Sequence, residues 1–324
     1  MIGADEVKAF AKSRGADLVG IGSMDRFEGA PEQSDPRRIF PEARSIIGLG
    51  FRIHRGLLRG IEEGTYFAGY AAMGYASIND VYAPIVLREV GNFIEDNGYE
   101  AVLYQNTSVR LGCGVGKRVS PDRPRPDVFL HFRIAAVICG MGEIGYSKLF
   151  LSPEFGPRQR LAFIITDAPL EPDPIFEGGI CDRCMACVKE CPAGAISAKE
   201  TVKIEVAGKE LEWGKLDEEK CGAVYQAGTP EYSPFMTDEV ARVVRGIVGD
   251  KGNPPEQSAC KVDVWSYLRE NMQYVRNAWE SYHPSTICGG RGCIRACMIH
   301  LERAGKISNV FKSPFRKREP WRLG

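Results

Sequence analysis

The stretch Cys181-Asp-Arg-Cys184-Met-Ala-Cys187-Val-Lys-Glu-Cys191-Pro192 determines what the second half of this chain is expected to do. Its spacing, C-x2-C-x2-C-x3-C-P, is that of thiolate ligands to [4Fe–4S] clusters, in which the fourth cysteine serves a second cluster. The short gaps let one loop wrap three thiolates around one cluster, and Pro192 limits how the backbone continues after Cys191. A zinc site would favour separate C-x2-C pairs. The stretch therefore predicts two [4Fe–4S] clusters.

Cysteines further along the chain must complete the two clusters. Cys293 and Cys297 lie four residues apart on a predicted helix that runs to Ala304, so both thiols face one side of it. Because the ligands of such a cluster pair cross over, Cys297 is expected to complete the first cluster. The predicted ligands of that cluster are Cys181, Cys184, Cys187 and Cys297.

The second cluster is expected to take Cys191, Cys288 and Cys293, and its fourth ligand is either Cys221 or Cys260. Cys221 lies in a predicted turn, and the glycine that follows it allows close approach to a cluster. Cys260 precedes a predicted helix, and an unliganded buried thiol is common in proteins. This difference favours Cys221.

Composition narrows the class of protein. Lys+Arg and Asp+Glu balance at 42 each in the 324 residues, so no net field favours nucleic acid or an anionic membrane. No run of about 18 apolar residues predicts a transmembrane helix, and the segment Met1 to Gly15 lacks the apolar core of a signal peptide. We therefore expect a cytoplasmic protein, whose 11 cysteines bind metal rather than form disulfides.

Two regions are predicted, with a boundary near residue 175. The Pro-rich stretch Pro169–Pro174 marks the boundary, and every cysteine except Cys113 and Cys139 follows it. The first region is predicted to mix helices and strands. Predicted helices cover Asp5 to Arg14, Ser77–Asn97, Thr237–Val248 and Val262–Glu280. A short apolar run covers Leu18 to Ile21. Predicted strands cover Ile46–Ile53, Ala101–Tyr104 and Leu161–Thr166.

Three stretches before the cysteines resemble the core of the corrinoid-dependent reductases, which comprise the reductive dehalogenases and the epoxyqueuosine reductases. They are Arg133–Gly145 (RIAAVICGMGEIG), Leu151–Arg158 (LSPEFGPR) and Phe163–Leu170 (FIITDAPL), and Ala16–Ile21 and Pro41–Ile47 are similar to the start of those proteins. The resemblance covers most of residues 1–221 and resumes at 288–298, so about 222–287 look like an insertion. It implies an α+β fold, with a nitroreductase-like α/β core at 1–175 and a ferredoxin-like double [4Fe–4S] domain at 176–324.

The resemblance also implies a cofactor. The family binds cobalamin base-off, and electrons from the clusters would reduce cobalt to the Co(I) state that attacks an electrophilic substrate. In that family two glycine-rich segments surround the corrinoid, although a glycine-rich turn can also be purely structural. The residues to which this role is carried over are Gly140, Gly142, Gly145, Phe155 and Gly156.

A proton donor is needed to complete such a reduction. Epoxyqueuosine reductases place a catalytic aspartate shortly before the glycine-rich turn, and Asp127 lies within one residue of that place. Reductive dehalogenases use a tyrosine with a nearby cation. Further candidates of compatible type, each with a purely structural alternative, are Tyr104, Tyr146, His131, Lys117 and Arg118.

Together these features predict a cytosolic iron–sulfur reductase that uses cobalamin to reduce a small organic molecule. We expect reduced ferredoxin or flavodoxin as its electron donor, and neither a membrane nor a nucleic acid as a partner. One alternative is an electron-transfer protein or activating reductase that delivers electrons to a partner corrinoid protein. Another is a flavin in the nitroreductase-like core.

Overall fold

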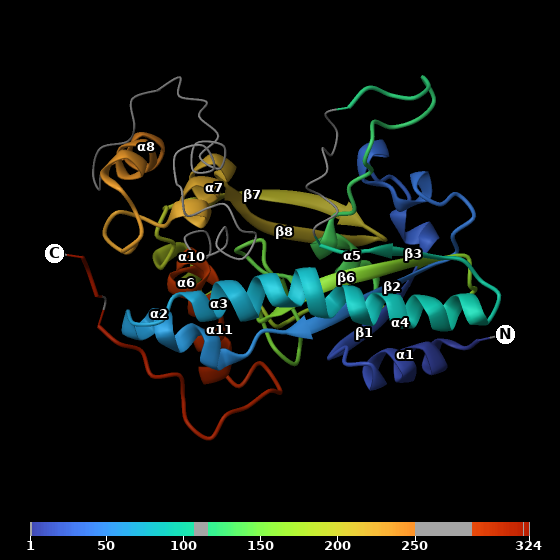
Figure 1. The fold of residues 1–324 in the computed structure, drawn as a ribbon, viewed down its shortest axis with the longest axis horizontal. Coiled ribbons are helices and arrows are strands. Elements are labelled where there is room, and N and C mark those ends of the chain that lie inside the picture. Colours follow the sequence, from blue (N-terminus) through green and yellow to red (C-terminus); the bar gives the residue numbers. More distant parts are fainter. Residues whose placement is uncertain (1, 107–115, 250–286, 320, 324) are drawn as a thin grey trace.

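The computed structural model describes residues 2–106, 116–249, 287–319 and 321–323. Within them a four-stranded sheet lies between helices, and a long hairpin leads from the sheet toward a group of short helices (Figure 1). No helix in these ranges is both long enough and apolar enough to cross a bilayer.

The four-stranded sheet is antiparallel throughout, with the strand order β1-β2-β6-β3. Its strands are β1 (Leu18–Ser23), β2 (Ser45–Arg52), β3 (Ala101–Tyr104) and β6 (Gln159–Thr166). Ile47 of β2 lies opposite Ile21 of β1 and Ile164 of β6, and all three side chains are fully buried. Because β-branched side chains pack well across neighbouring strands, this row helps to fix the register.

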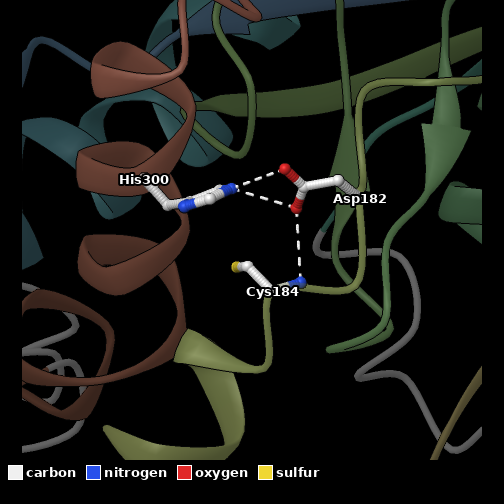
Figure 2. A group of neighbouring side chains, drawn as sticks. All are labelled: Asp182, Cys184 and His300. Atoms are coloured by element: carbon white, nitrogen blue, oxygen red, sulfur yellow. Dashed lines mark hydrogen bonds and ion pairs between the residues drawn. The ribbon is translucent and has the colours of Figure 1, made fainter.

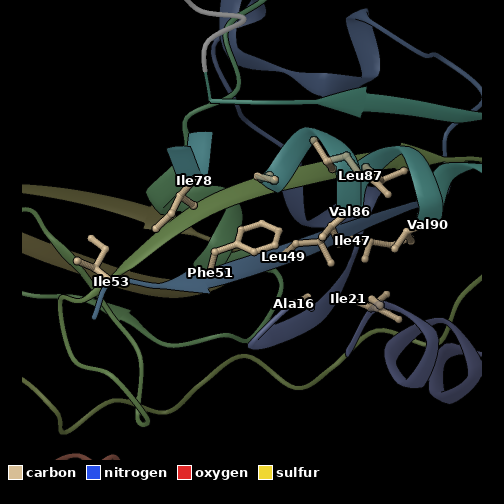
Figure 3. Packing of buried hydrophobic residues seen from close by; sticks show 14 of the residues in the cluster. Ala16, Ile21, Ile47, Leu49, Phe51, Ile53, Ile78, Val86, Leu87 and Val90 are labelled. Atoms are coloured by element: carbon tan, nitrogen blue, oxygen red, sulfur yellow. The ribbon is translucent and has the colours of Figure 1, made fainter. Parts of the chain in front are cut away.

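Helices α1 (Ala4–Ser13) and α4 (Ala83–Asp96) cover one face of the sheet. Val86, Leu87 and Val90 of α4 follow helical spacing and are buried. Figure 3 shows them against Ile47 and Leu49 of β2. The chain enters α4 through α2 (Arg59–Glu63), α3 (Ala68–Ala71) and two π-helical turns at Ala72–Ala76 and Ile78–Tyr82.

Helix α5 (Phe132–Ile138) covers the opposite face, and glycines make room for it. A Cβ atom at Gly20 would lie 2.2 Å from the carbonyl oxygen of Cys139, and one at Gly48 would lie 2.5 Å from Sδ of Met141. Successive residues of a strand point to opposite faces. The glycines of β1 and β2 therefore face α5, while the large side chains between them face α4.

The second half of the chain is built from a hairpin and short helices. The hairpin is β7 (Ile196–Val206) with β8 (Lys209–Leu216), and a two-stranded pair, β4 (Glu143–Ile144) with β5 (Phe150–Leu151), precedes it. The helices are α6 (Ala186–Lys189), α7 (Glu218–Ala227), α8 (Asp238–Val248), α10 (Ile287–Arg291) and α11 (Cys293–Arg303).

Helix α11 is anchored to the first half by a buried ion pair. Arg295 of α11 donates two hydrogen bonds to the carboxylate of Glu62 in α2, and the exposed fractions of their side chains are 5% and 0%. The backbone N–H of Arg318 donates to the same carboxylate at 2.6 Å. Burial by itself would raise the pKa of Glu62, but these hydrogen bonds and the charge of Arg295 lower it. Met298 of α11 also packs into the core around the sheet.

Most predicted elements of the first half are present within two or three residues. The predicted helix over Ser77–Asn97 begins as a π-helical turn, and the predicted helix Thr237–Val248 is α8. The predicted helix Val262–Glu280 lies outside the described residues. The hairpin β7–β8 was not predicted. The fold mixes helices and strands as expected, whereas the nitroreductase-like core, the ferredoxin-like domain and the boundary near residue 175 stay predictions.

Candidate functional site

One group of four cysteines lies where the loop before α6 meets α11. The loop is tightly wound, because Arg183 and Met185 have positive φ angles of 56° and 61°. Burial raises the pKa of the Cys297 thiol well above its usual range, and four neighbouring thiols add to the rise. These neighbours are, in order of effect, Cys181, Cys187, Cys184 and Cys293. We call Cys297 and the first three of them the outer cysteine group, because the Cys184 side chain is exposed.

A second group of four cysteines lies next to the outer one. Burial raises the pKa of the Cys293 thiol to about 12, and the thiols of Cys191 and Cys221 add to the rise. Burial and the thiols of Cys293, Cys221 and Cys191 likewise raise the pKa of Cys288. We call Cys191, Cys221, Cys288 and Cys293 the inner cysteine group. The structure therefore brings together the two sets of four that the spacing predicted, with Cys221 in the inner set.

Cys221 differs from its predicted local structure. It was predicted to lie in a turn, but it lies in the first turns of helix α7, whose N-terminus is capped by Asp217. Oδ1 of Asp217 accepts the backbone N–H of Lys220 at 3.0 Å, which satisfies one of the free N–H groups at the helix start. The turn prediction was wrong because the capping role of Asp217 was not recognised. Cys260 lies outside the described residues.

Both groups have the chemistry that an iron–sulfur cluster requires. A [4Fe–4S] cluster takes four thiolates, and hydrogen bonds to the sulfurs tune it. The backbone N–H of Tyr146 donates to Sγ of Cys181 at 3.3 Å, and that of Ala195 donates to Sγ of Cys191 at 3.4 Å. Each group thus combines four converging thiols with a backbone donor to one of its sulfurs. The residues present fit one cluster in each group.

An Asp–His pair flanks the outer group, as Figure 2 shows. Nε2 of His300, on α11, lies 2.9 and 2.8 Å from the two carboxylate oxygens of Asp182. Oδ1 of Asp182 also accepts the backbone N–H of Cys184 at 3.2 Å. The hydrogen bond from His300 lowers the pKa of Asp182. The pair therefore ties the cysteine loop to α11. It was not predicted, because Asp182 occupies a position that the C-x2-C spacing leaves unspecified and His300 lies beyond Cys297.

A cavity of about 600 Å³ lies between the inner group and the sheet. All four inner cysteines line it, whereas no cysteine of the outer group does. The opposite wall comes from α5, from β6 and from the tyrosines of the helical stretch before α4. Polar and charged side chains of the lining include Arg133, Arg160, Lys148, Glu218, Tyr75 and Tyr225. The volume is within the range of cavities that hold small molecules or parts of cofactors.

His131 lines this cavity, unlike the other five candidate residues for the proton transfer. Its Nδ1 accepts the backbone N–H of Ile134 at 3.3 Å and so caps α5. Burial, followed by the charges of Arg133 and Lys148, lowers the pKa of His131 to about 4. The imidazole is therefore neutral near pH 7, with Nδ1 as an acceptor and the proton assigned to Nε2.

The other candidate proton donors occupy different places. The Tyr104 hydroxyl donates to the carbonyl of Val128 at 2.9 Å, and the Tyr146 hydroxyl donates to the carbonyl of Ser197 at 3.0 Å. Asp127 has an exposed side chain, and its carbonyl oxygen accepts a hydrogen bond from Gln33. Lys117 is also exposed, and Arg118 pairs with Glu32 at 3.0 Å. None of these residues lines the cavity, and their catalytic roles stay predictions.

The predicted corrinoid-binding residues pack closely against the protein itself. A Cβ atom at Gly142 would lie 2.0 Å from the carbonyl oxygen of Leu151, and one at Gly140 would lie 2.4 Å from that of Pro174. A Cβ at Gly145 would lie 3.6 Å from Sγ of Cys181. Phe155 is buried, and Gly156 contacts α11. None of the five lines the cavity, so their cofactor role also stays a prediction.

Comparison with known proteins gives relatives but no match to a protein-family model. A tetrachloroethene reductive dehalogenase of Dehalobacter restrictus is 37% identical over 250 residues, which cover 68% of this chain and 44% of that protein. An epoxyqueuosine reductase of Bacillus subtilis is 24% identical over 213 residues, or 59% of this chain and 51% of that protein. The chain thus spans less than half the length of the dehalogenases that it matches.

A solved structure resembles the fold. A catabolic reductive dehalogenase in complex with 3-bromo-4-hydroxybenzoic acid aligns with a TM-score of 0.50 and 20% identity, covering 75% of this chain and 33% of that one. At this identity the likeness concerns the fold alone. Sequence similarity shows more than the fold. This chain is related to the reductive dehalogenases and the epoxyqueuosine reductases, as its motifs predicted.

Proposed function

We propose that this protein is an iron–sulfur oxidoreductase that reduces a small organic molecule in the cavity. In this proposal the outer and inner cysteine groups each hold a [4Fe–4S] cluster, and the cavity takes cobalamin next to the inner one. The single observation that carries the proposal is the lining of the cavity, to which all four inner cysteines contribute. The relatives named above, which are reductases, support it.

The arrangement of the two groups supports a direction for electron flow. Cys184 of the outer group is exposed and offers a point of entry for electrons from a carrier such as ferredoxin or flavodoxin. Cys187 of the outer group is among the thiols close enough to Cys293 to raise its pKa, so the groups are neighbours. Electrons would therefore pass from the surface through the outer and then the inner group to the cavity.

Cobalamin, when bound, would supply the nucleophilic and electron-transferring chemistry that amino-acid side chains lack. The chain's own residues would bind and orient the reactants and handle protons. His131 is the predicted catalytic residue that lines the cavity, and because it stays neutral near pH 7 its Nε2–H can donate a hydrogen bond to the reacting group but does not supply a proton. The apolar part of the lining, such as Phe132 and Leu161, would limit the access of water.

The metal and cofactor content of the anaerobically purified chain tests the proposal. Two [4Fe–4S] clusters predict about eight iron and about eight sulfide per chain; about four of each would contradict it. Added cobalamin should bind stoichiometrically and change its absorption spectrum. A flavin spectrum, or iron–sulfur absorption without any affinity for cobalamin, would favour the flavin enzyme or the electron-transfer protein instead.

His131→Gln tests the role of the histidine. The variant is expected to lower kcat with little change in cobalamin affinity, because glutamine offers a weaker hydrogen-bond donor at the same place. An unchanged kcat would remove His131 from the proposal.

A further inference from the structure

The cavity contains two arginines whose charges are not balanced by any carboxylate among the described residues. Arg133 extends from α5 and Arg160 from β6, and both line the cavity. Burial lowers the pKa of Arg133 most, and the nearby charge of Arg160 lowers it further, while the thiols of Cys293 and Cys221 oppose this. Two like charges brought together beside a partly buried space are unfavourable unless an anion joins them.

The partners of the two guanidinium groups differ. Arg160 donates to Oδ1 of Asn79 at 3.0 Å and to Oδ1 of Asn106 at 3.2 Å, and its guanidinium lies 4.0 Å from the ring centre of Tyr75. All three partners are uncharged and hold the group in place. For Arg133, no residue in the described ranges accepts a hydrogen bond or forms an ion pair. Its donors remain available to a ligand.

The third cation of the cavity is already balanced. Lys148 forms an ion pair with Glu218 at 3.1 Å, and both residues line the cavity. Among the described lining residues, Glu218 is the only carboxylate. The described part of the lining therefore carries an excess of positive charge, and that excess belongs to Arg133 and Arg160.

We propose that Arg133 and Arg160 bind the oxyanion of an anionic organic substrate, such as an aromatic carboxylate or phenolate. Arginine suits this role because its planar guanidinium donates two parallel hydrogen bonds to a carboxylate. A neutral halogenated alkene such as tetrachloroethene, for which the dehalogenase relatives are named, offers no acceptor for them. This inference rests on the proposed function only in assigning the cavity to the substrate.

The same oxyanion chemistry has a second source, because cobalamin carries a phosphodiester in its nucleotide tail. The cluster proposed for the inner group is a further negative charge near Arg133, since Cys293 and Cys221 face it. A test must therefore distinguish three partners of the arginines. These are a substrate anion, the phosphate of the cofactor and the negative charge of the inner cluster.

The test compares 3-bromobenzoate with its neutral isostere 3-bromobenzamide, by calorimetry on the cluster-containing chain with and without cobalamin. We expect the chain to bind the benzoate at least about tenfold more tightly than the amide, as one charge-assisted bidentate contact predicts. Arg133→Gln should abolish this preference, and Arg133→Lys should restore part of it. Arg123→Gln, which removes an equal charge from an exposed pair with Asp122, should leave it unchanged.

Four outcomes overturn the proposal. One is the absence of a preference in the unaltered chain, and another is a preference that survives Arg133→Gln. In the third, Arg133→Gln weakens the binding of cobalamin but not of cobinamide, which lacks the phosphate. Benzoate binding is then unchanged. The last is a variant that shifts only the midpoint potential of the inner cluster. A preference for benzoate in a chain that does not bind cobalamin would support the anion site and refute the proposed cofactor.

Discussion

The two cysteine groups have the same kind of ligands but opposite surroundings. The outer group has an exposed member, Cys184, and an Asp–His pair at the surface. Burial raises thiol pKa values in both groups, but only the inner group lines the cavity. The difference shows how two neighbouring groups can each contact a different molecule. In the proposed function, a redox partner reaches the outer group, and the occupant of the cavity reaches the inner one.

The largest effect is expected from removing an inner cysteine. Cys288→Ala should eliminate the inner cluster, so that iron falls from about eight to about four per chain and reduction in the cavity stops. Iron analysis and electron paramagnetic resonance of the reduced protein measure both results. Cys139→Ala is the matched control, because Cys139 is buried outside both groups and should leave the iron content unchanged. Loss of all the iron would show that the two groups do not bind clusters independently.

A large loss of stability is expected at the anchor of α11, the helix that contributes to both groups. Glu62→Gln leaves the buried Arg295 with only its longer ion pair to Glu190, at 3.6 Å, so we expect the free energy of unfolding to fall by about 3–5 kcal/mol. Urea denaturation of the cluster-containing protein measures this.

The neighbouring Glu63 provides the control for that substitution. Glu63 forms a more exposed ion pair with Arg318 at 2.8 Å. Glu63→Gln should therefore cost less than about 1 kcal/mol. Equal losses in the two variants would contradict the anchoring role of the buried pair.

Sequence spacing predicted the cysteine groups better than it predicted the cavity. The outer group follows from a continuous run with a known pattern, completed by Cys297 one helical turn beyond Cys293. The inner group was predicted as far as the choice between Cys221 and Cys260. The alternation of large residues with glycine in β1 and β2 was visible in the sequence, but only the structure shows that α5 fills the space above Gly20 and Gly48.

The charged part of the cavity could not be predicted, since its residues come from separate elements. Arg133 lies in α5, Arg160 in β6 and Tyr225 in α7, and no spacing along the chain indicates that they meet. The hairpin β7–β8 was missed for another reason. Its strand β7 alternates Val202, Ile204 and Val206 with exposed polar residues, which is the pattern of a half-buried strand, and this signal was overlooked.

A smaller effect is expected from the titration of His131 at the cavity. The unfolded chain takes up a proton on this histidine near pH 6.5, whereas the folded one does so only near pH 4. The folded state is therefore destabilised as the pH falls through this window. Between pH 6.5 and 5.0 we expect a loss of about 1–2 kcal/mol.

His131→Asn isolates that contribution, because asparagine can still cap α5 but does not titrate. Urea denaturation of both proteins at the two pH values gives the difference. An identical pH dependence in both would show that His131 is not buried as a neutral group next to Arg133 and Lys148.

The smallest effect is expected at the Asp–His pair beside the outer group. Asp182→Asn preserves an oxygen that can accept from Cys184 N–H but removes the charge that faces His300. The side chains of Asp182 and His300 are 36% and 30% exposed, so water screens their interaction. We expect a loss below about 1 kcal/mol, measured by urea denaturation, with an unchanged iron content. A loss as large as that of Glu62→Gln would mean that the cysteine loop, and not only α2, holds α11 in place.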